Sequence, residues 1–233
     1  MSIGVLGAAE LPGLNGNAEA RTAAVASEAA SRWSPGDFAA QQIHGLVRQV
    51  FFSSSEKPVR QVVLSALDCE TKIGPLCRRV AEELAKEAAG SVALVGAAGE
   101  FEHLNQNPEQ WRRSDLKPLQ RISTRLAENL WFVPAGLTGS TTATTSGLRA
   151  YLAEVGREFE FSVVEGQPAG QSIETTTLAQ LADGIILVLS ARHTRRVTAQ
   201  RVKETLDRSK VRILGTVLAD RTFPMPERLY RRL

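Results

Sequence analysis

The chain has 233 residues, of which 43% are hydrophobic and 23% charged, with a formal net charge of +3 and a sequence pI near 9.1. These values are ordinary for a soluble globular protein and allow one full hydrophobic core. No stretch approaches the roughly 20 apolar residues of a membrane span, and the first residues lack the layout of a signal peptide. We therefore expect a cytoplasmic protein.

The N-terminal 40 residues predict an arm or linker. They are rich in Ala, Gly and Ser and are interrupted by Pro12-Gly13 and Pro35-Gly36, with a short helix expected around 18–32. We assign residues 1–40 to this partly flexible arm and residues 41–233 to a single α/β domain. An amphipathic pattern from Phe38 to Phe52 predicts the first helix that packs on that domain.

Short apolar runs then alternate with helical patterns. The predicted strands are Gln61–Ser65, Ser91–Val95, Leu130–Val133, Phe159–Val164, Ile185–Leu189 and Val211–Leu218. The predicted helices are Leu76–Ala89, Ser146–Gly156, Thr175–Ala182 and Val197–Arg208. Near-continuous apolar strands separated by amphipathic helices are typical of a parallel sheet with both faces covered. We predict a three-layer α/β fold with a mostly parallel central sheet, and little regular structure between Gly99 and Ser123.

The segment after the first strand has the position of a phosphate-binding loop. Such a loop needs glycines, so that successive backbone N–H groups converge on a phosphate, and a Ser or Thr after its lysine to bind Mg²⁺. The residues here are Asp68, Cys69, Glu70, Thr71, Lys72, Ile73 and Gly74. A β-branched Thr71 at a position of positive φ would cost about 1–3 kcal/mol. We therefore expect a different loop shape, in which the phosphate cradle is lost.

Cysteine and histidine do not predict a metal site. Cys69 and Cys77 lie eight positions apart with no histidine near them in the sequence, which indicates two reduced thiols. The histidines His44, His103 and His193 belong to separate predicted elements. No metal ligand set is assigned.

The order of segments over residues 43–233 resembles the bacterial tyrosine autokinases of exopolysaccharide synthesis and export. Those enzymes belong to the deviant-Walker P-loop ATPases, together with the chromosome-partitioning and division-site ATPases, so the resemblance implies a P-loop NTPase-like fold. The segments that carry it are Leu46–Ser53, Val62–Lys72, Val92–Gly96, Pro134–Gly136, Phe159–Pro168, Ala182–Gly184 and Pro224–Leu233.

The chain departs from this family at its functional positions. Of the family's Gly-x-Gly-Lys-Ser/Thr core only Lys72 survives, and the family's Asp-x-Asp motif after the second strand reads Gly96-Ala97-Ala98. Glu165 stands where the family has the Walker B aspartate, and Tyr230 is the only tyrosine of the tail. The resemblance therefore implies a degenerate member in which the loop and Glu165 are vestigial, and we assign no catalytic residue.

These departures predict a pseudo-ATPase or pseudokinase. We expect it to act as an interaction or regulatory protein in exopolysaccharide or cell-envelope biosynthesis, without a cofactor. The expected partner is a protein of that assembly system, such as a membrane-bound copolymerase at the inner face of the cell membrane. One alternative is a residual ATP-dependent protein-tyrosine kinase or ATPase of capsular polysaccharide export, using ATP and Mg²⁺ with Lys72 and Glu165. Another is a partitioning-type positioning protein that binds DNA or membrane.

The C-terminal part of the chain is basic. Residues 192–233 hold twelve Lys and Arg against four Asp and Glu, a local balance of +8. Such a segment can meet nucleic acid, anionic lipid or an acidic protein, and a solvated helix face with a tail is the alternative. The candidate anion or partner patch consists of Arg192, Arg195, Arg196, Arg228, Arg231 and Arg232.

The predicted first helix also bears on assembly. Ring-forming autokinases resemble one another in a Glu-x-x-Arg-x-x-Arg motif on this helix, and the matching positions here are Gln42, Gly45 and Arg48. Two of the three are changed, so the charge pairs between subunits are missing. We expect a monomer or dimer rather than a ring.

Overall fold

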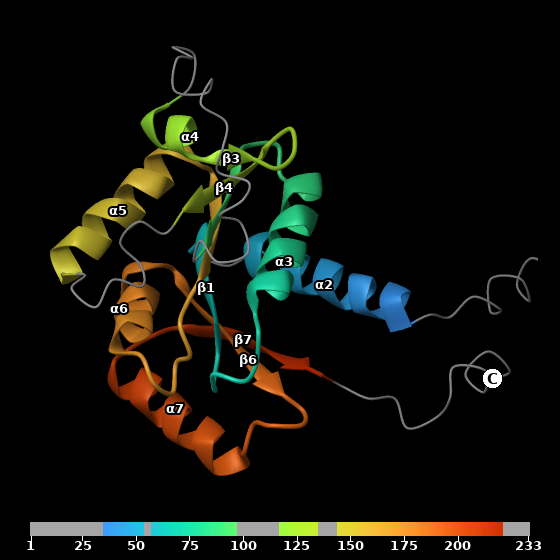
Figure 1. Ribbon diagram of the computed structural model, residues 1–233, viewed down its shortest axis with the longest axis vertical. Coiled ribbons are helices and arrows are strands. Elements are labelled where there is room, and N and C mark those ends of the chain that lie inside the picture. The colour runs from blue at the N-terminus through green and yellow to red at the C-terminus, as the bar shows by residue number, and fades with distance from the viewer. Residues whose placement is uncertain (1–34, 54–56, 97–116, 135–143, 221–233) are drawn as a thin grey trace, which may run out of the picture. The chain divides into compact units, whose positions relative to one another are not determined.

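The computed structural model describes residues 35–53, 57–96, 117–134 and 144–220 (Figure 1). Its helices are α2 (Pro35–Phe51), α3 (Gly74–Glu87), α4 (Pro118–Ile122), α5 (Thr145–Glu158), α6 (Ile173–Leu181) and α7 (Arg196–Arg208). Its strands are β1 (Gln61–Ala66), β2 (Val92–Gly96), β3 (Thr124–Arg125), β4 (Leu130–Pro134), β5 (Phe161–Glu165), β6 (Gly184–Ser190) and β7 (Ile213–Ala219). The helix expected around residues 18–32 lies outside the described residues.

The seven strands form one sheet in the order β3-β4-β2-β5-β1-β6-β7. Only β3 runs antiparallel to its neighbour, and the other neighbouring pairs are parallel. The predicted mostly parallel sheet is therefore confirmed. After β1 the chain adds β2 and β4 on one side, and later β6 and β7 on the other. The carboxyl end of β1 consequently lies at a topological switch point, where open α/β sheets bind their ligands.

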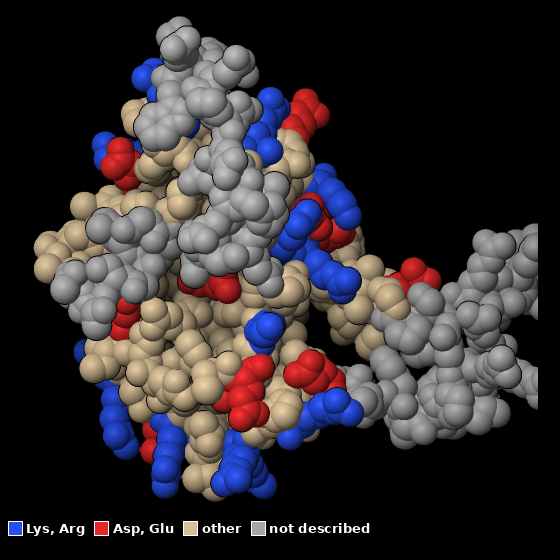
Figure 2. Space-filling model, in the orientation of Figure 1, with Lys and Arg blue, Asp and Glu red and all other residues tan. Residues whose placement is uncertain are grey.

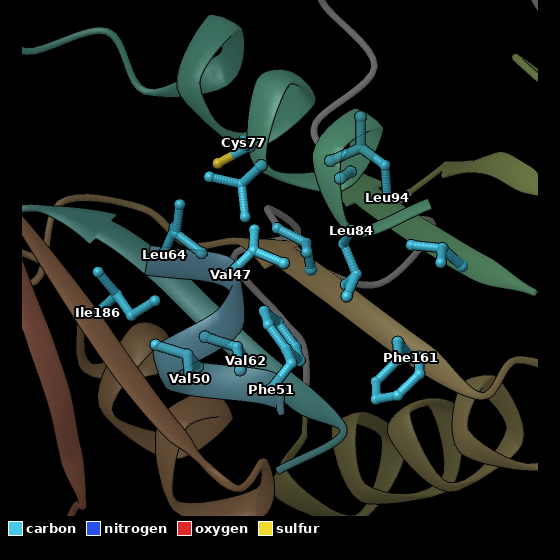
Figure 3. Close-up of a cluster of buried hydrophobic side chains, with 14 of the residues drawn as sticks. Val47, Val50, Phe51, Val62, Leu64, Cys77, Leu84, Leu94, Phe161 and Ile186 are labelled. Atoms are coloured by element: carbon cyan, nitrogen blue, oxygen red, sulfur yellow. The ribbon is translucent and has the colours of Figure 1, made fainter. Parts of the chain in front are cut away.

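Helices cover both faces of this sheet (Figure 1). On one face, side chains of α2 and α3 pack in one cluster with Val62, Leu64 and Ala66 of β1. Figure 3 shows part of this cluster, with Val47 beside the strand residues. On the other face, Val63 of β1 packs with side chains of α5, α6 and α7. Alternate residues of β1 thus supply two separate cores, which explains why its sequence is apolar almost throughout.

Helix α2 begins at Pro35, three residues before the predicted start. Proline is tolerated there because the first N–H groups of a helix have no partner within it. The buried positions of α2 include Val47, Val50 and Phe51, one face of the amphipathic pattern. None of the helices in the described ranges is both long enough and apolar enough to cross a membrane.

Two elements were not predicted. Helix α4 falls within the segment 99–123, where little regular structure is expected, and β3 follows that segment directly. The carboxylate of Glu158 on α5 accepts hydrogen bonds from the backbone N–H groups of Leu119, at 3.0 Å, and Gln120, at 3.2 Å. These donors at the start of α4 are satisfied by a residue 38 or more positions away. The local signals are limited to Pro118 at the first position and a 3.3 Å hydrogen bond from the N–H of Lys117 to the side chain of Gln120. Strand β3 has two residues, too few for a periodic pattern.

Candidate functional site

The candidate site is built around the β1–α3 loop, which we define as residues 67–73. It follows the central strand at the switch point of the sheet. Three of its side chains are buried, namely Leu67, Thr71 and Ile73. Its exposed side chains are Cys69, Glu70 and Lys72. The loop is therefore anchored by its apolar and hydroxyl residues, and the surviving lysine is in contact with solvent.

Asp68 is the hydrogen-bonding centre of the loop. One of its carboxylate oxygens accepts from the backbone N–H of Thr71 at 3.1 Å and from its hydroxyl at 2.7 Å. The other accepts from the hydroxyl of Thr194 at 2.9 Å. Burial acts to raise the pKa of Asp68, but the hydrogen bonds from Thr71 and Thr194 together outweigh it, so the pKa lies below its ordinary value. At neutral pH the loop therefore encloses a carboxylate of its own.

The backbone of the β1–α3 loop does not form an anion nest. Such a nest alternates right-handed and left-handed residues so that successive N–H groups point to one centre. Among the described residues, positive φ values occur at Lys210, Asp220 and Gly184, all outside the loop. The N–H of Thr71 is also already bonded to Asp68. The loop thus holds two carboxylates, Asp68 and Glu70, and none of its residues has a positive φ.

The start of α3 lacks a metal-binding hydroxyl. Ile73 occupies the N-cap position without a side-chain hydrogen bond, and its side chain is 6% exposed within the core cluster that also holds Cys77. An apolar side chain pointing into the core offers no oxygen to Mg²⁺. Lys72, just before Ile73, lies next to the positive end of the α3 dipole. Two positive charges at this position do not favour the binding of a metal cation.

Glu165 ends β5, two strands from β6 and next to β2. Its carboxylate leans over Gly96, because a Cβ atom built on that glycine would lie 2.9 Å from Oε2 of Glu165. Burial, together with the charge of nearby Glu165, raises the pKa of the Cys77 thiol well above its ordinary value. Glu165 therefore occupies the space beside Gly96. Gly96 is the position at which the autokinase family has the first aspartate of its Asp-x-Asp motif. Ala97 and Ala98 lie outside the described residues.

The β6–α7 turn, defined as residues 191–195, packs against the β1–α3 loop. The hydroxyl of Thr194 accepts from the N–H of Ser190 at 2.8 Å while donating to Asp68. Nδ1 of His193 lies 2.9 Å from Oε2 of Glu70. The two segments are 126 positions apart at the Asp68–Thr194 contact. Thr194 was not predicted as a site residue, because no local pattern in the sequence links such distant residues.

Only part of the predicted basic patch can be placed. Arg192, Arg195 and Arg196 are exposed in the β6–α7 turn and the first position of α7. They are therefore close together in the chain and accessible. The remaining members of the patch, Arg228, Arg231 and Arg232, lie outside the described residues.

Two of the three histidines, His44 and His193, are described and lie on different elements, and His103 lies outside the described residues. His44 on α2 contacts Glu83 of α3 at 2.9 Å and Glu87 at 3.2 Å, while His193 contacts Glu70. In the described part of the chain no group of three His, Cys, Asp or Glu side chains is arranged to hold a metal ion.

Arg48, the one unchanged position of the ring motif, makes an ion pair within its own chain. Arg48 of α2 lies 3.7 Å from a carboxylate oxygen of Glu87 on α3, and its side chain is 66% exposed. Gln42 and Gly45 are exposed on the same helix. The oligomeric state remains a prediction.

The sheet order, the flanking helices and the loop between β1 and α3 define the fold of the P-loop ATPase-like α/β proteins. Among solved structures, the kinase domain of Escherichia coli tyrosine kinase ETK is similar with a TM-score of 0.60 and 10% identity, covering 80% of this chain and 79% of that one. The VpsO kinase domain is similar with a TM-score of 0.58 and 16% identity, over 80% of this chain and 98% of that one.

A ParA family ATPase has the same fold. The ParA family ATPase of Chlorobium tepidum is similar with a TM-score of 0.53 and 12% identity, over 72% of this chain and 76% of that one. No protein-family model and no curated protein matches the sequence. The resemblance predicted from the sequence is thus confirmed at the level of the fold. The vestigial role of residues 68–74 stays a prediction.

Proposed function

We propose that this protein is a non-catalytic relative of the tyrosine kinase domains that share its fold, and that it acts by binding a protein partner in exopolysaccharide or cell-envelope assembly. The observation that carries the proposal is the Asp68 carboxylate, which accepts two hydrogen bonds from Thr71 inside the loop. Phosphoryl transfer depends on donors and metal ions that stabilise negative charge. A loop closed around its own carboxylate supplies the opposite.

The energetics of nucleotide binding support the same proposal. Lys72 is an exposed point charge, and such a charge contributes about 1 kcal/mol or less in water. About 4 kcal/mol separates millimolar from micromolar affinity. Ile73, which follows Lys72, is buried and has no oxygen in its side chain, and Gly96, which ends β2, has no side chain at all. Neither residue therefore provides a side-chain ligand for Mg²⁺.

The proposed partner is a protein of the assembly system, such as a membrane-bound copolymerase. This partner would bring the chain from the cytoplasm to the inner face of the cell membrane. The proposal draws on the tyrosine kinase domains with the same fold and on the exposed cations of the β6–α7 turn.

Calorimetry with ATP and Mg²⁺ tests the proposal. We expect no saturable heat up to about 1 mM ATP, and no difference between the wild-type chain and Lys72→Ala. A cell lacking the gene should regain its envelope phenotype equally with either version. A Kd near about 10 µM that disappears in Lys72→Ala would overturn the pseudoenzyme proposal.

That contrary result would support the second candidate, a residual ATP-dependent kinase or ATPase. Two observations favour it: Lys72 is exposed beside the start of α3, and a carboxylate, Glu165, remains at the end of β5. In that case Asp68 would have to leave Thr71 on binding. Asp68→Ala should then strengthen ATP binding, whereas under our proposal it leaves binding undetectable.

The third candidate, a positioning protein that binds DNA or membrane, is favoured by the exposed arginines of the β6–α7 turn. It requires salt-dependent binding to duplex DNA or to vesicles containing anionic lipid. Binding that persists after Arg195→Ala and Arg196→Ala would argue against this turn as the contact.

A further inference from the structure

The two edges of the sheet differ in how well they are protected. Strand β3, at one edge, has two residues and includes the charged Arg125. Strand β7, at the other edge, runs for seven residues, Ile213–Ala219, without a charged residue or a proline. Natural proteins shorten their edge strands or place charges and prolines on them, because an open edge pairs with other chains. Apart from a register irregularity near its start, between the pairs Ile185–Ile213 and Ile186–Gly215, the β7 edge carries none of these protections.

The outward backbone groups of β7 follow from its contacts with β6. The carbonyl of Ala219 accepts a hydrogen bond from the N–H of Ala191 at 3.0 Å, so the polar backbone groups of Ala219 face β6. Because the direction alternates along a strand, those of Leu218 and Thr216 face away from the sheet. In the described part of the chain no strand pairs with this side of β7. Both side chains are exposed, Leu218 by 57%.

A cluster of cations lies at the carboxyl end of this edge. The Ala191–Ala219 bond and a 2.8 Å bond from the Ser190 hydroxyl to Asp220 fix the β6–α7 turn against the end of β7. Residues 192–196, in the turn and at the start of α7, contain three Arg and no Asp or Glu. Figure 2 shows Lys and Arg side chains gathered at the edge of the molecule where Figure 1 places α7.

We propose that the β7 edge and the β6–α7 turn together bind an extended acidic segment of a protein partner, which adds to the sheet as a strand beside β7. The row of backbone groups recognises an extended chain, and the arginines of the turn recognise its carboxylates. Charge disfavours other occupants. A second copy would bring two basic turns together, and residues 221–233 of this chain hold four Arg against one Glu.

This inference rests on the proposed function for its biological meaning, since it names the chemistry of the protein partner. It can be tested with the purified full-length chain and model peptides. The probes are a ten-residue peptide of alternating valine and glutamate and a matched peptide of alternating valine and lysine. In ¹⁵N-labelled protein, we expect the glutamate peptide to shift the amide signals of Thr216 and Leu218, with a Kd of about 0.1–1 mM. The lysine peptide should bind at least about tenfold more weakly.

Thr216→Pro separates backbone pairing from other modes of binding. The N–H of Thr216 points away from β6, so a proline at this position removes no hydrogen bond of the sheet. We expect it to abolish glutamate-peptide binding, while the control Thr216→Val, which keeps the N–H, binds as the wild type does. Dispersed amide spectra of both variants would verify that they are folded.

The cationic turn is tested independently of that proline. Arg195→Ala combined with Arg196→Ala should weaken the glutamate peptide by about tenfold and reduce the salt dependence of its binding. The matched control removes two cations farther along α7, Lys203→Ala with Arg208→Ala; these pair with Asp207 and Glu204. The control should bind within about twofold of the wild type.

Three results with the peptides would overturn the inference. These are no shift on β7 with either peptide, equal binding of both peptides, or peptide binding that Thr216→Pro leaves intact. Sedimentation showing a dimer that Thr216→Pro dissociates would assign the edge to a second copy and also overturn it. ATP binding in the calorimetric test would refute the proposed function and leave the peptide result standing, so the two failures are distinguishable.

Discussion

The β1–α3 loop and the β6–α7 turn follow the carboxyl ends of the neighbouring strands β1 and β6, yet they differ in the charge that they present to an anion. In the loop, the carboxylate of Asp68 uses the N–H and hydroxyl of Thr71. In the turn, hydrogen bonds of Ser190 and Thr194 fix the backbone while Arg192 and Arg195 remain exposed. Positive charge beside the β1–α3 loop is therefore carried by side chains, and no residue of that loop has a positive φ. The two segments are also joined, since Thr194 donates to Asp68.

The largest effect is expected from Ile73→Ser, which restores a hydroxyl after the lysine. Ile73 is buried in the core, so the variant should lose about 3 kcal/mol of unfolding free energy in urea. Ile73→Val, the matched control, should lose about 1 kcal/mol. We expect no gain of ATP binding from the serine. A serine variant as stable as the wild type would show that the loop tolerates a functional residue after all.

Asp68→Asn should have the next largest effect, about 1–2 kcal/mol at pH 7, because a neutral amide is a weaker acceptor for three donors. The folded pKa of Asp68 lies below its unfolded value of about 3.9, so its stabilisation is complete above that pH and is lost as the pH falls through the folded pKa. The difference between wild type and variant should therefore stay constant from about pH 7 to 5 and shrink below about pH 4.

Glu70→Gln is the control for this titration. Glu70 is exposed and pairs with the partly exposed His193, so its loss should change stability by less than about 0.5 kcal/mol. A pH dependence in Glu70→Gln equal to that of Asp68→Asn would assign the titration to something other than the loop carboxylate.

Thr194→Val tests whether the loop and the turn are coupled. It removes the hydroxyl that joins Ser190 to Asp68, and we expect a loss of about 1 kcal/mol. In a double-mutant cycle with Asp68→Asn, the two losses should overlap by about 0.5 kcal/mol or more. Strictly additive losses would mean that the two segments are stabilised independently.

The smallest effect is expected at Lys72. The side chain is exposed, so Lys72→Ala should leave the unfolding free energy within about 0.5 kcal/mol of the wild type. Arg195→Ala, in the turn, should be equally silent in stability. A Lys72→Ala variant that is markedly more or less stable would reveal a structural role for the lysine.

The sequence by itself determined the fold. Six strands were predicted near their observed positions, because residues buried on both faces leave continuous apolar runs such as Val62–Leu64 and Val92–Val95. The position of the loop after β1 also followed from the sequence, since it depends on chain order alone. These features depend on neighbours in the chain, so their signal is local.

Tertiary structure alone decided how the site is closed. The bond from Thr194 to Asp68 spans 126 positions, and α4 starts on Glu158, 39 positions from Leu119. Neither contact leaves a periodic pattern. The exposure of β7 likewise depends on which strand lies at the edge, which the order of strands in the chain does not specify. Such hydrogen bonds and sheet edges exist only after distant parts of the chain have come together in the fold. For that physical reason the charged residues of the site, such as Asp68 and Lys72, could be found in the sequence, whereas a partner such as Thr194 could not.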